Sequence, residues 1–138
     1  MNNQVQAELK KIFNSRFSTS ESTRANYARG EDTYDPILSK AVVFPETNEE
    51  VSKILSLCNQ HKIPVVPFGT GTSLEGHVVG NEKGITISLE KMNKILNVNA
   101  EDFDCRVQAC VTKEQLNEYL REDGVFFPID PGANAAIG

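Results

Sequence analysis

Apolar residues recur along this chain with two different periods, and the change from one period to the other predicts the order of helices and strands. Near the N-terminus, Val5, Leu9, Ile12 and Phe13 keep the three- and four-residue spacing of one helical face. Further along, residues 84–89 alternate between apolar and small or polar side chains, which is the two-residue period of a strand. The sequence therefore predicts a chain that contains both kinds of element.

Residues 41–66 have the pattern of a strand, a helix and a second strand. The apolar run 41–44 predicts the first strand, and 65–66 predict the second. Between them, Thr47 and Glu50 have the spacing of a capping box at the start of a helix. The apolar side of this helix is predicted to comprise Val51, Ile54, Leu55 and Cys58. A crossover of about thirty residues makes the two strands parallel.

The remaining segments extend this pattern. Residues 18–23 are predicted to form a loop, and residues 26–36 irregular structure. Two further strands are expected over 95–98 and 104–111, and a strand or extended segment over 126–129. A second capping box, formed by Thr112 and Gln115, opens a helix that Gly124 closes. The predicted fold class is α+β, with a small mixed sheet, a βαβ unit, flanking helices and the truncated start of a second subdomain.

Composition narrows the classes of function. The chain has 138 residues, of which 39% are hydrophobic and 24% charged, as in a globular domain. Its net charge of −5 argues against a nucleic-acid partner, and no apolar run approaches the ~20 residues of a membrane span. Three cysteines and two histidines are too few for a disulfide framework, a metal site or a catalytic triad. With no signal-peptide pattern at the N-terminus, a cytoplasmic location is expected.

Candidate chemistry is concentrated in residues 64–76, directly after a predicted strand. Gly69 and Gly71 let the backbone turn sharply, and successive N–H groups in such a loop form a concave nest for an anion, typically phosphate. Thr70, Thr72 and Ser73 add hydroxyl donors. The loop carries no Lys or Arg, so amides and hydroxyls would have to meet the phosphate charge.

Two common phosphate loops do not match these residues. A P-loop requires Lys at the position of His77 and Ser or Thr at the position of Val78. A Rossmann fingerprint requires glycine at the position of Leu74. A glycine-rich turn that binds no ligand is the alternative interpretation of the same residues.

With the loop 64–76, several further segments in the same order resemble one flavoprotein family. They are residues 41–47, 84–92, 97–102, 111–120 and 126–133. Together they are similar to the FAD-binding domain of the vanillyl-alcohol oxidase / p-cresol methylhydroxylase superfamily, over about residues 27–138. The segment 73–77 most resembles the branch that holds cytochrome-type D-lactate dehydrogenases and the FAD subunit of glycolate oxidase.

The resemblance implies which residues hold FAD. It assigns the pyrophosphate and the flavin side to Pro67, Phe68, Gly69, Thr70, Gly71, Thr72, Ser73, Gly76, Pro131, Gly132, Ala133 and Gly138. Some members attach FAD covalently through a histidine that matches Thr72, so non-covalent FAD is expected here. The family usually has glycine at the position of Cys110, where a side chain could crowd the cofactor or force a turn to adjust. No catalytic residue and no metal ligand is implied within the chain.

The resemblance also implies the function and the domain organisation. Residues 1–40 would be an N-terminal helix and an irregular lead-in, and residues 41–138 an FAD-binding domain truncated at its C-terminal end. The parent enzyme would oxidise a D-2-hydroxy acid such as lactate or glycolate to the 2-oxo acid, using a cap domain that this chain lacks. Electrons would pass to an acceptor protein or a quinone, with the parent cytoplasmic or peripheral to a membrane. The alternatives are a non-catalytic remnant or nucleotide-binding module, and a superfamily member that oxidises a different alcohol.

Overall fold

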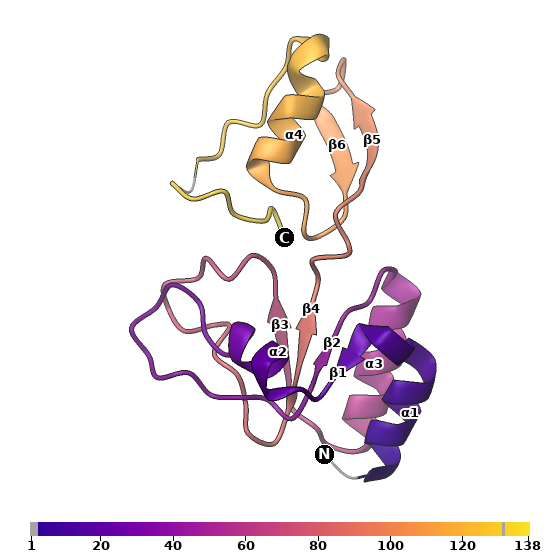
Figure 1. Ribbon diagram of the computed structural model, residues 1–138. Helices are drawn as coiled ribbons and strands as arrows, with labels where there is room; N and C mark the ends of the chain where they lie inside the picture. Colours follow the sequence, from indigo (N-terminus) through magenta and orange to yellow (C-terminus); the bar gives the residue numbers. More distant parts are fainter. Residues whose placement is uncertain (1–2, 131) are drawn as a thin grey trace.

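The computed structural model describes residues 3–130 and 132–138, which fold into two lobes (Figure 1). The first lobe contains α1 (Asn3–Phe13), a 3-10 turn (Asn14–Arg16), β1 (Phe17–Ser18), α2 (Glu21–Asn26), β2 (Val42–Val43), α3 (Asn48–Gln60), β3 (Val65–Phe68) and β4 (Ile85–Ser88). The second contains β5 (Ile95–Asn99), β6 (Asp104–Val107), α4 (Lys113–Leu120) and a second 3-10 turn (Arg121–Asp123).

The sheet of the first lobe is mixed, with the strand order β1-β2-β4-β3. β2 and β3 both pair in parallel with β4, since Val42 and Val66 each lie opposite Thr86. β1 pairs antiparallel with β2, and Phe17 lies opposite Val43. The predicted α+β fold with a βαβ unit is therefore confirmed, and β4 lies between the two strands of that unit.

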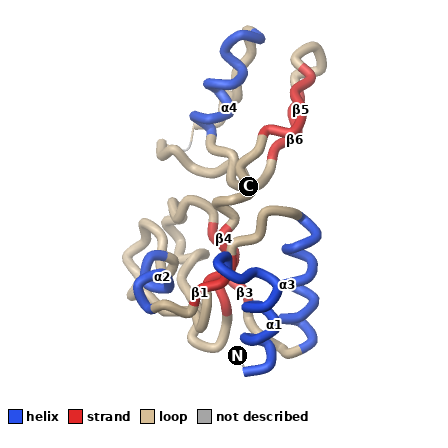
Figure 2. Tube along the Cα trace, turned by 45° about the vertical axis from the view of Figure 1, so that its right-hand side comes forward, coloured by secondary structure: helices blue, strands red, loops and turns tan. Residues whose placement is uncertain are grey.

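The two-residue period of β4 separates the two faces of this sheet, and both faces are covered. Ile85 and Ile87 join a core with side chains from α1 and α3, namely Val5, Leu9, Phe13, Ile54 and Cys58. α1 and α3 lie side by side along this face in both views (Figures 1 and 2). Leu55 was expected in the core but is 46% exposed, because the buried stripe of α3 is narrower than its apolar pattern.

The opposite face of β4 is polar. It is covered by residues 27–41 between α2 and β2, which we call the lead-in. Thr86 and Ser88 are fully buried there, and the Thr86 hydroxyl donates to Ser39 Oγ at 2.8 Å. Ala28 is also buried. Its carbonyl accepts hydrogen bonds from the amides of Ile37 and Gly80, at 3.4 and 3.0 Å. The irregular lead-in therefore forms a packed layer although it has no regular secondary structure.

The prediction of a loop over residues 18–23 is wrong in two places. Ser18 belongs to β1, and α2 begins at Glu21. β1 has only two residues, and it exists because Phe17 is buried and the backbone pairs with β2. No local period indicates such a strand, because its hydrogen bonds join residues about twenty-five positions apart.

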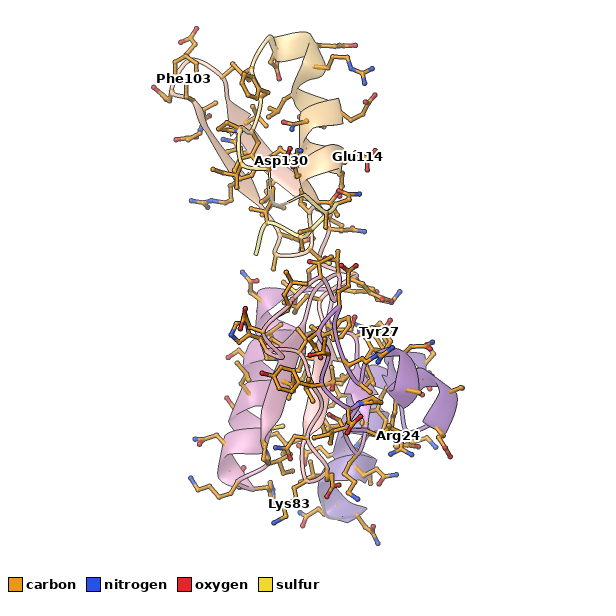
Figure 3. The ribbon with its side chains drawn as sticks, turned by 90° about the vertical axis from the view of Figure 1, so that its left-hand side faces the viewer. Arg24, Tyr27, Lys83, Phe103, Glu114 and Asp130 are labelled. Carbon is orange, nitrogen blue, oxygen red and sulfur yellow. The ribbon has the colours of Figure 1, made fainter. Side chains whose placement is uncertain are left out.

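The second lobe is a hairpin with one helix packed on it, as predicted, but its second strand ends at Val107 and not at residue 111. Its core is small and consists of Val111, Leu116 and Leu120. Gly124 ends the helical segment with φ +70°. Residues 126–129 belong to no strand. Phe103 is 84% exposed at the tip of the hairpin, far from the first lobe (Figure 3).

Both predicted helix caps form. In each predicted capping box, however, the side chain three residues after the cap bonds to a partner other than the backbone amide of the cap. Thr47 and Thr112 accept hydrogen bonds from the amides of Glu50 and Gln115, each at 3.2 Å. The Gln115 side chain donates to the Asn93 carbonyl at 2.8 Å and not back to its cap. Among the residues that the structure describes, no helix combines the length and the apolar character needed to cross a bilayer.

An ion pair joins the N-terminal elements to the start of α3. Arg16 donates from both terminal nitrogens to the two Glu50 carboxylate oxygens, at 2.6 Å each, and to the Phe44 carbonyl at 3.1 Å. The same carboxylate accepts the Glu46 amide at 2.7 Å. These donors stabilise the charged form, so the pKa of Glu50 falls to about 2.

We predict that Glu50→Gln destabilises the fold by about 1–2 kcal/mol at pH 7, because it leaves Arg16 without its carboxylate in a partly shielded site. The pKa of Glu50 is depressed on folding, so the contribution is present above pH 4.5 and is lost as the pH falls toward 2. Urea denaturation of both proteins across this pH range measures the difference.

Glu49→Gln is the matched control, because it removes a carboxylate from the same helical turn that makes no ion pair within the described residues. The control is expected to cost less stability than Glu50→Gln. Equal losses in the two variants, or a Glu50→Gln loss that persists at pH 2, contradict the assignment.

Candidate functional site

The glycine-rich loop follows β3 directly and lies at the end of the sheet that faces the second lobe. The carboxyl ends of the parallel strands β2, β3 and β4 all point toward this end (Figure 1). Ligands of open α/β sheets bind characteristically at the carboxyl ends of parallel strands. The position of the loop is therefore that of a binding site.

The backbone of this loop presents a run of unused donors. Within the described residues, the amides of Gly69, Thr70, Gly71, Thr72 and Ser73 donate no hydrogen bond. Gly71 has φ +76°, a conformation that glycine adopts without steric cost. Consecutive unpaired N–H groups around such a residue make a concave, positively polarised surface that suits an anion. We call the segment 69–73 the cradle.

The C-terminal segment of the chain lies against the cradle. The Ala136 amide donates to Thr70 Oγ1 at 3.2 Å. A Cβ atom added to Gly69 would lie 3.4 Å from the Ala136 Cβ and 3.8 Å from the Gly138 carbonyl oxygen. Ile137 and Gly138 donate in turn to the carbonyls of Val111 and Ala109, at 2.9 and 3.0 Å. The structure thus brings the predicted site residues 69–70 and 138 together at the junction of the lobes.

The other predicted C-terminal residues line a separate polar cleft. Gly132 and Ala133 border a cavity of about 530 Å³ together with Lys113, Glu114, Asn117, Glu118, Arg121, Asp130 and Asn134. None of the cradle residues lines this cleft. Pro131, also predicted to touch the cofactor, lies outside the described residues.

Two polar pairs fix the mouth of this cleft, and Figure 3 shows Glu114 and Asp130 beside the first turn of α4. The Lys113 ammonium lies 2.9 Å from the Asp130 carboxylate and lowers the pKa of that group. Asn134 donates to Glu114 Oε2 at 2.7 Å and accepts the Glu114 amide at 3.3 Å. The α4 N-terminus is therefore tied to the segment that follows residue 129.

Phe68 is a predicted site residue whose side chain has a structural role. Its ring packs under the cradle, where a Cβ added to Gly71 would come within 2.8 Å of Phe68 Cζ. The Tyr27 ring meets the Phe68 ring edge-on, with their centroids 5.0 Å apart. The Tyr27 hydroxyl donates to Glu90 Oε2 at 2.5 Å, and burial together with this carboxylate raises the pKa of Tyr27 to about 12. The tyrosine is therefore neutral at physiological pH.

No sequence pattern connects Tyr27 and Glu90 with the loop. Both lie in segments without a periodic pattern, and they are sixty-three positions apart. Figure 3 shows Tyr27 at the end of the first lobe nearest the second lobe, whereas Lys83 lies at the far end. A signal for this contact could come only from the tertiary structure.

Cys110 fits its position without an unusual backbone. It is buried, its amide donates to the Met92 carbonyl at 2.8 Å, and it is not among the described residues with positive φ. Burial and the nearby Glu90 charge raise the pKa of the thiol. A neutral thiol is a weak nucleophile, so this site favours a packing role for Cys110.

His77 is close to the cradle but has no metal-binding partners. Its Nδ1 lies 3.2 Å from Ser73 Oγ, so the imidazole and the hydroxyl share a hydrogen bond. Within the described residues, no group of three or more His, Cys, Asp or Glu side chains could hold a metal ion. The prediction that His77 is a loop residue agrees with its exposure.

The donor set fits a diphosphate. Five successive amides and three hydroxyls surround the turn, and none of its side chains carries a negative charge that would repel phosphate. Backbone amides recognise phosphate by direction as well as by charge. The junction of the lobes can therefore hold the phosphates of a nucleotide cofactor.

Comparison with known sequences also indicates a site for a nucleotide cofactor. A family whose model is described as "FAD binding domain" matches residues 39–138. The chain is 41% identical over 120 residues to a probable mitochondrial D-lactate dehydrogenase of Danio rerio, covering 87% of this chain and 24% of that protein. It is 38% identical over 134 residues to the mitochondrial D-lactate dehydrogenase [cytochrome] of Arabidopsis thaliana, covering 96% and 24%.

The glycolate oxidase subunit GlcD of Bacillus subtilis is a more distant relative. It is 31% identical over 117 residues, which cover 85% of this chain and 25% of that protein. The chain thus spans about a quarter of the length of these curated relatives.

Solved structures share the fold at lower identity. An alkyldihydroxyacetonephosphate synthase superimposes with a TM-score of 0.90 over 100% of this chain and 29% of that chain, at 20% identity. A p-cresol methylhydroxylase superimposes with a TM-score of 0.77 over 88% and 25%, at 22% identity. These likenesses confirm the predicted fold class.

Proposed function

The chain belongs to the FAD binding domain family, its cofactor is FAD, and we propose that it supplies the adenine and pyrophosphate side of the FAD site in an oxidoreductase that acts on D-2-hydroxy acids. The unpaired amides of the cradle are the observation that carries this proposal. They lie at the carboxyl ends of parallel strands, where a diphosphate can accept several hydrogen bonds at once.

Each part of the cradle has a proposed task. The amides of residues 69–73 bind the pyrophosphate oxygens, and the Thr72 and Ser73 hydroxyls add donors. Pro67 and Phe68 shape the entry from β3, and Gly76 provides the next close turn, with φ +73°. FAD, when bound, supplies the redox chemistry by accepting a hydride from the substrate.

We also propose that the C-terminal segment lies along the flavin side of the cofactor. Pro131, Gly132 and Ala133 would pass the ribityl chain and the ring, and Gly138 would meet the cofactor beside the cradle. The contact of Ala136 with Thr70 supports the last of these assignments. Gly132, with φ +80° and no atom within 4 Å of an added Cβ, leaves open space on that side.

The substrate class rests on the names of the relatives and on how much of them this chain covers. Relatives at 41% and 38% identity are named D-lactate dehydrogenases, and one at 31% is a glycolate oxidase subunit. Since the chain spans about a quarter of their length, we place the substrate-binding and catalytic residues outside these 138 residues. We propose that residues 41–138 are the first part of the FAD-binding domain and that residues 1–40, which include α1, β1 and α2, precede it.

The proposal extends to partners and location. The proposed partner of the whole enzyme is an electron-acceptor protein or a quinone. We propose a cytoplasmic location. The relatives of Danio rerio and Arabidopsis thaliana are named mitochondrial, so fractionation of cells that express the chain decides between the two compartments.

We predict that the chain binds FAD and that Gly71→Ala weakens this binding at least tenfold. The methyl group would come within 2.8 Å of Phe68 Cζ, and alanine disfavours φ +76°, so the cradle must change shape. Isothermal titration with FAD measures the affinity, and circular dichroism reports whether the helices remain.

Gly124→Ala is the matched control. It places alanine at φ +70°, with no atom within 4 Å of the new Cβ, at the end of α4 and away from the cradle. Its affinity for FAD should equal that of the unsubstituted chain. Unchanged affinity in Gly71→Ala would show that the loop does not bind the pyrophosphate, and absence of FAD binding by the unsubstituted chain would refute the proposed function.

Another prediction concerns the bond to the cofactor. Because Thr72 offers a hydroxyl where a covalent attachment would need an imidazole or a thiol, FAD should be held without a covalent bond. Precipitation of the yellow complex with acid should leave all flavin absorbance in the supernatant. Flavin fluorescence that stays with the protein band on a denaturing gel would contradict the prediction.

The substrate class can be tested on the flavin absorbance. In an enzyme that carries residues 1–138 at its N-terminal end, anaerobic addition of D-lactate or glycolate should bleach the flavin absorbance at about 450 nm, and L-lactate should not. The isolated 138 residues loaded with FAD should remain oxidised with all three acids. Bleaching of the enzyme by a phenolic alcohol but by no hydroxy acid would assign it a different substrate.

A further inference from the structure

We infer that the lead-in segment 27–34 is a positioning element of the FAD cradle. It lies outside residues 39–138, which the family model matches, and its role rests on the proposed binding of pyrophosphate by the cradle. Four separate contacts connect this segment to the cradle, to the Phe68 ring beneath it and to the turn that follows it.

Gly30 is the point of closest approach. A Cβ added at this position would lie 2.7 Å from the Ser73 carbonyl oxygen, 2.8 Å from the Gly71 carbonyl oxygen and 2.9 Å from Val78 Cγ2. Backbone oxygens cannot move away as a flexible side chain can. The absence of a side chain at Gly30 therefore lets the lead-in pack directly beneath the cradle.

A hydrogen bond fixes the orientation of one cradle peptide. The Glu31 amide donates to the Gly71 carbonyl at 3.1 Å. In a trans peptide the C=O and the following N–H point in opposite directions, so this bond aims the Thr72 amide away from the lead-in. The lead-in thus determines where an amide donor of the cradle points.

The turn that presents this amide is itself held in place. The buried Asp32 carboxylate accepts the Gly30 amide at 3.1 Å and the Tyr34 amide at 3.0 Å. Because both donors belong to the backbone, the carboxylate closes a local turn around residue 32. This turn delivers Gly30 and Glu31 to the cradle in one conformation.

Two aromatic rings complete the support. The Tyr34 ring covers Gly76, where an added Cβ would lie 2.8 Å from ring carbons. The Tyr27 ring, tethered by its hydroxyl to Glu90, packs on Phe68, which lies directly under Gly71. The lead-in therefore contacts both Phe68, which lies under the cradle, and Gly76, in the turn that follows the cradle.

Gly30→Ala is the decisive variant. It should lower the affinity for FAD and for ADP by the same factor, at least tenfold, because both ligands place a diphosphate in the cradle. The matched control is Gly84→Ala, whose Cβ would meet the Pro64 carbonyl oxygen at 2.4 Å at the start of β4, the opposite end of the sheet. Both variants lose thermal stability, but only Gly30→Ala should lose affinity when titrated below its melting temperature.

A surface variant keeps the test usable where Gly30→Ala does not fold. Tyr34→Ala removes a ring that is 56% exposed and should weaken FAD and ADP about threefold. Tyr119→Ala removes a ring that is 59% exposed on α4 and should leave both affinities unchanged.

The possible results separate this inference from the proposed function. If the unsubstituted chain binds FAD and folded Gly30→Ala or Tyr34→Ala binds it equally well, the inference about the lead-in is wrong. The proposed binding of pyrophosphate by the cradle is then unaffected. If the unsubstituted chain binds neither FAD nor ADP, the proposed function fails. Loss of FAD affinity with unchanged ADP affinity also overturns the inference, because the effect then lies outside the pyrophosphate.

Discussion

The burial of β4 on both faces is the constraint on which the rest of this structure depends. All four residues of the strand are buried, and it pairs in parallel on both edges. A strand in that position must be covered by a layer on each side. α1 and α3 cover the apolar face, and the lead-in covers the polar face, where Thr86 bonds to Ser39. The parallel pairing also brings the carboxyl ends of β2, β3 and β4 to one end of the sheet, so the loop after β3 faces the second lobe.

The same arrangement explains why an irregular segment can position a binding loop. The lead-in has almost no secondary structure, so its order comes from contacts with β4, with the cradle and with residues 76–80. Its polar groups are used in pairs: the Ala28 carbonyl accepts two amides, and the Asp32 carboxylate accepts two more. Moving a segment satisfied in this way would leave buried polar groups without partners, so its hydrogen bonds oppose displacement.

The parts of the fold that could be predicted are those whose signal is local. The apolar stripe of α1, the Thr47 and Thr112 caps and the period of β4 each lie within a dozen residues, and these predictions are confirmed except for Ile12 of the stripe, which is 44% exposed. The glycine spacing of the cradle is equally local, so the loop could be singled out from residue types alone. β1, α2 and the support beneath Phe68 could not, since the contacts that define them join distant positions. Leu55 shows what periodicity cannot predict. The pattern identifies the apolar side of a helix, but it does not say how much of that side a neighbouring element buries.

A cradle without Lys or Arg must obtain its affinity from geometry. Amide dipoles carry only partial charges, so several must converge on the same oxygens to match one ammonium group. They have an advantage in return, since a fixed backbone loses no side-chain rotamer freedom when the ligand binds. That advantage exists only if the loop is held in its binding shape beforehand. The contacts of Glu31 with Gly71 and of Ala136 with Thr70 hold the cradle from two sides, one from the first lobe and one from the chain end of the second. An uncharged phosphate site in a chain of net charge −5 is therefore coupled to the packing of both lobes, and its affinity should depend on residues that never touch the ligand.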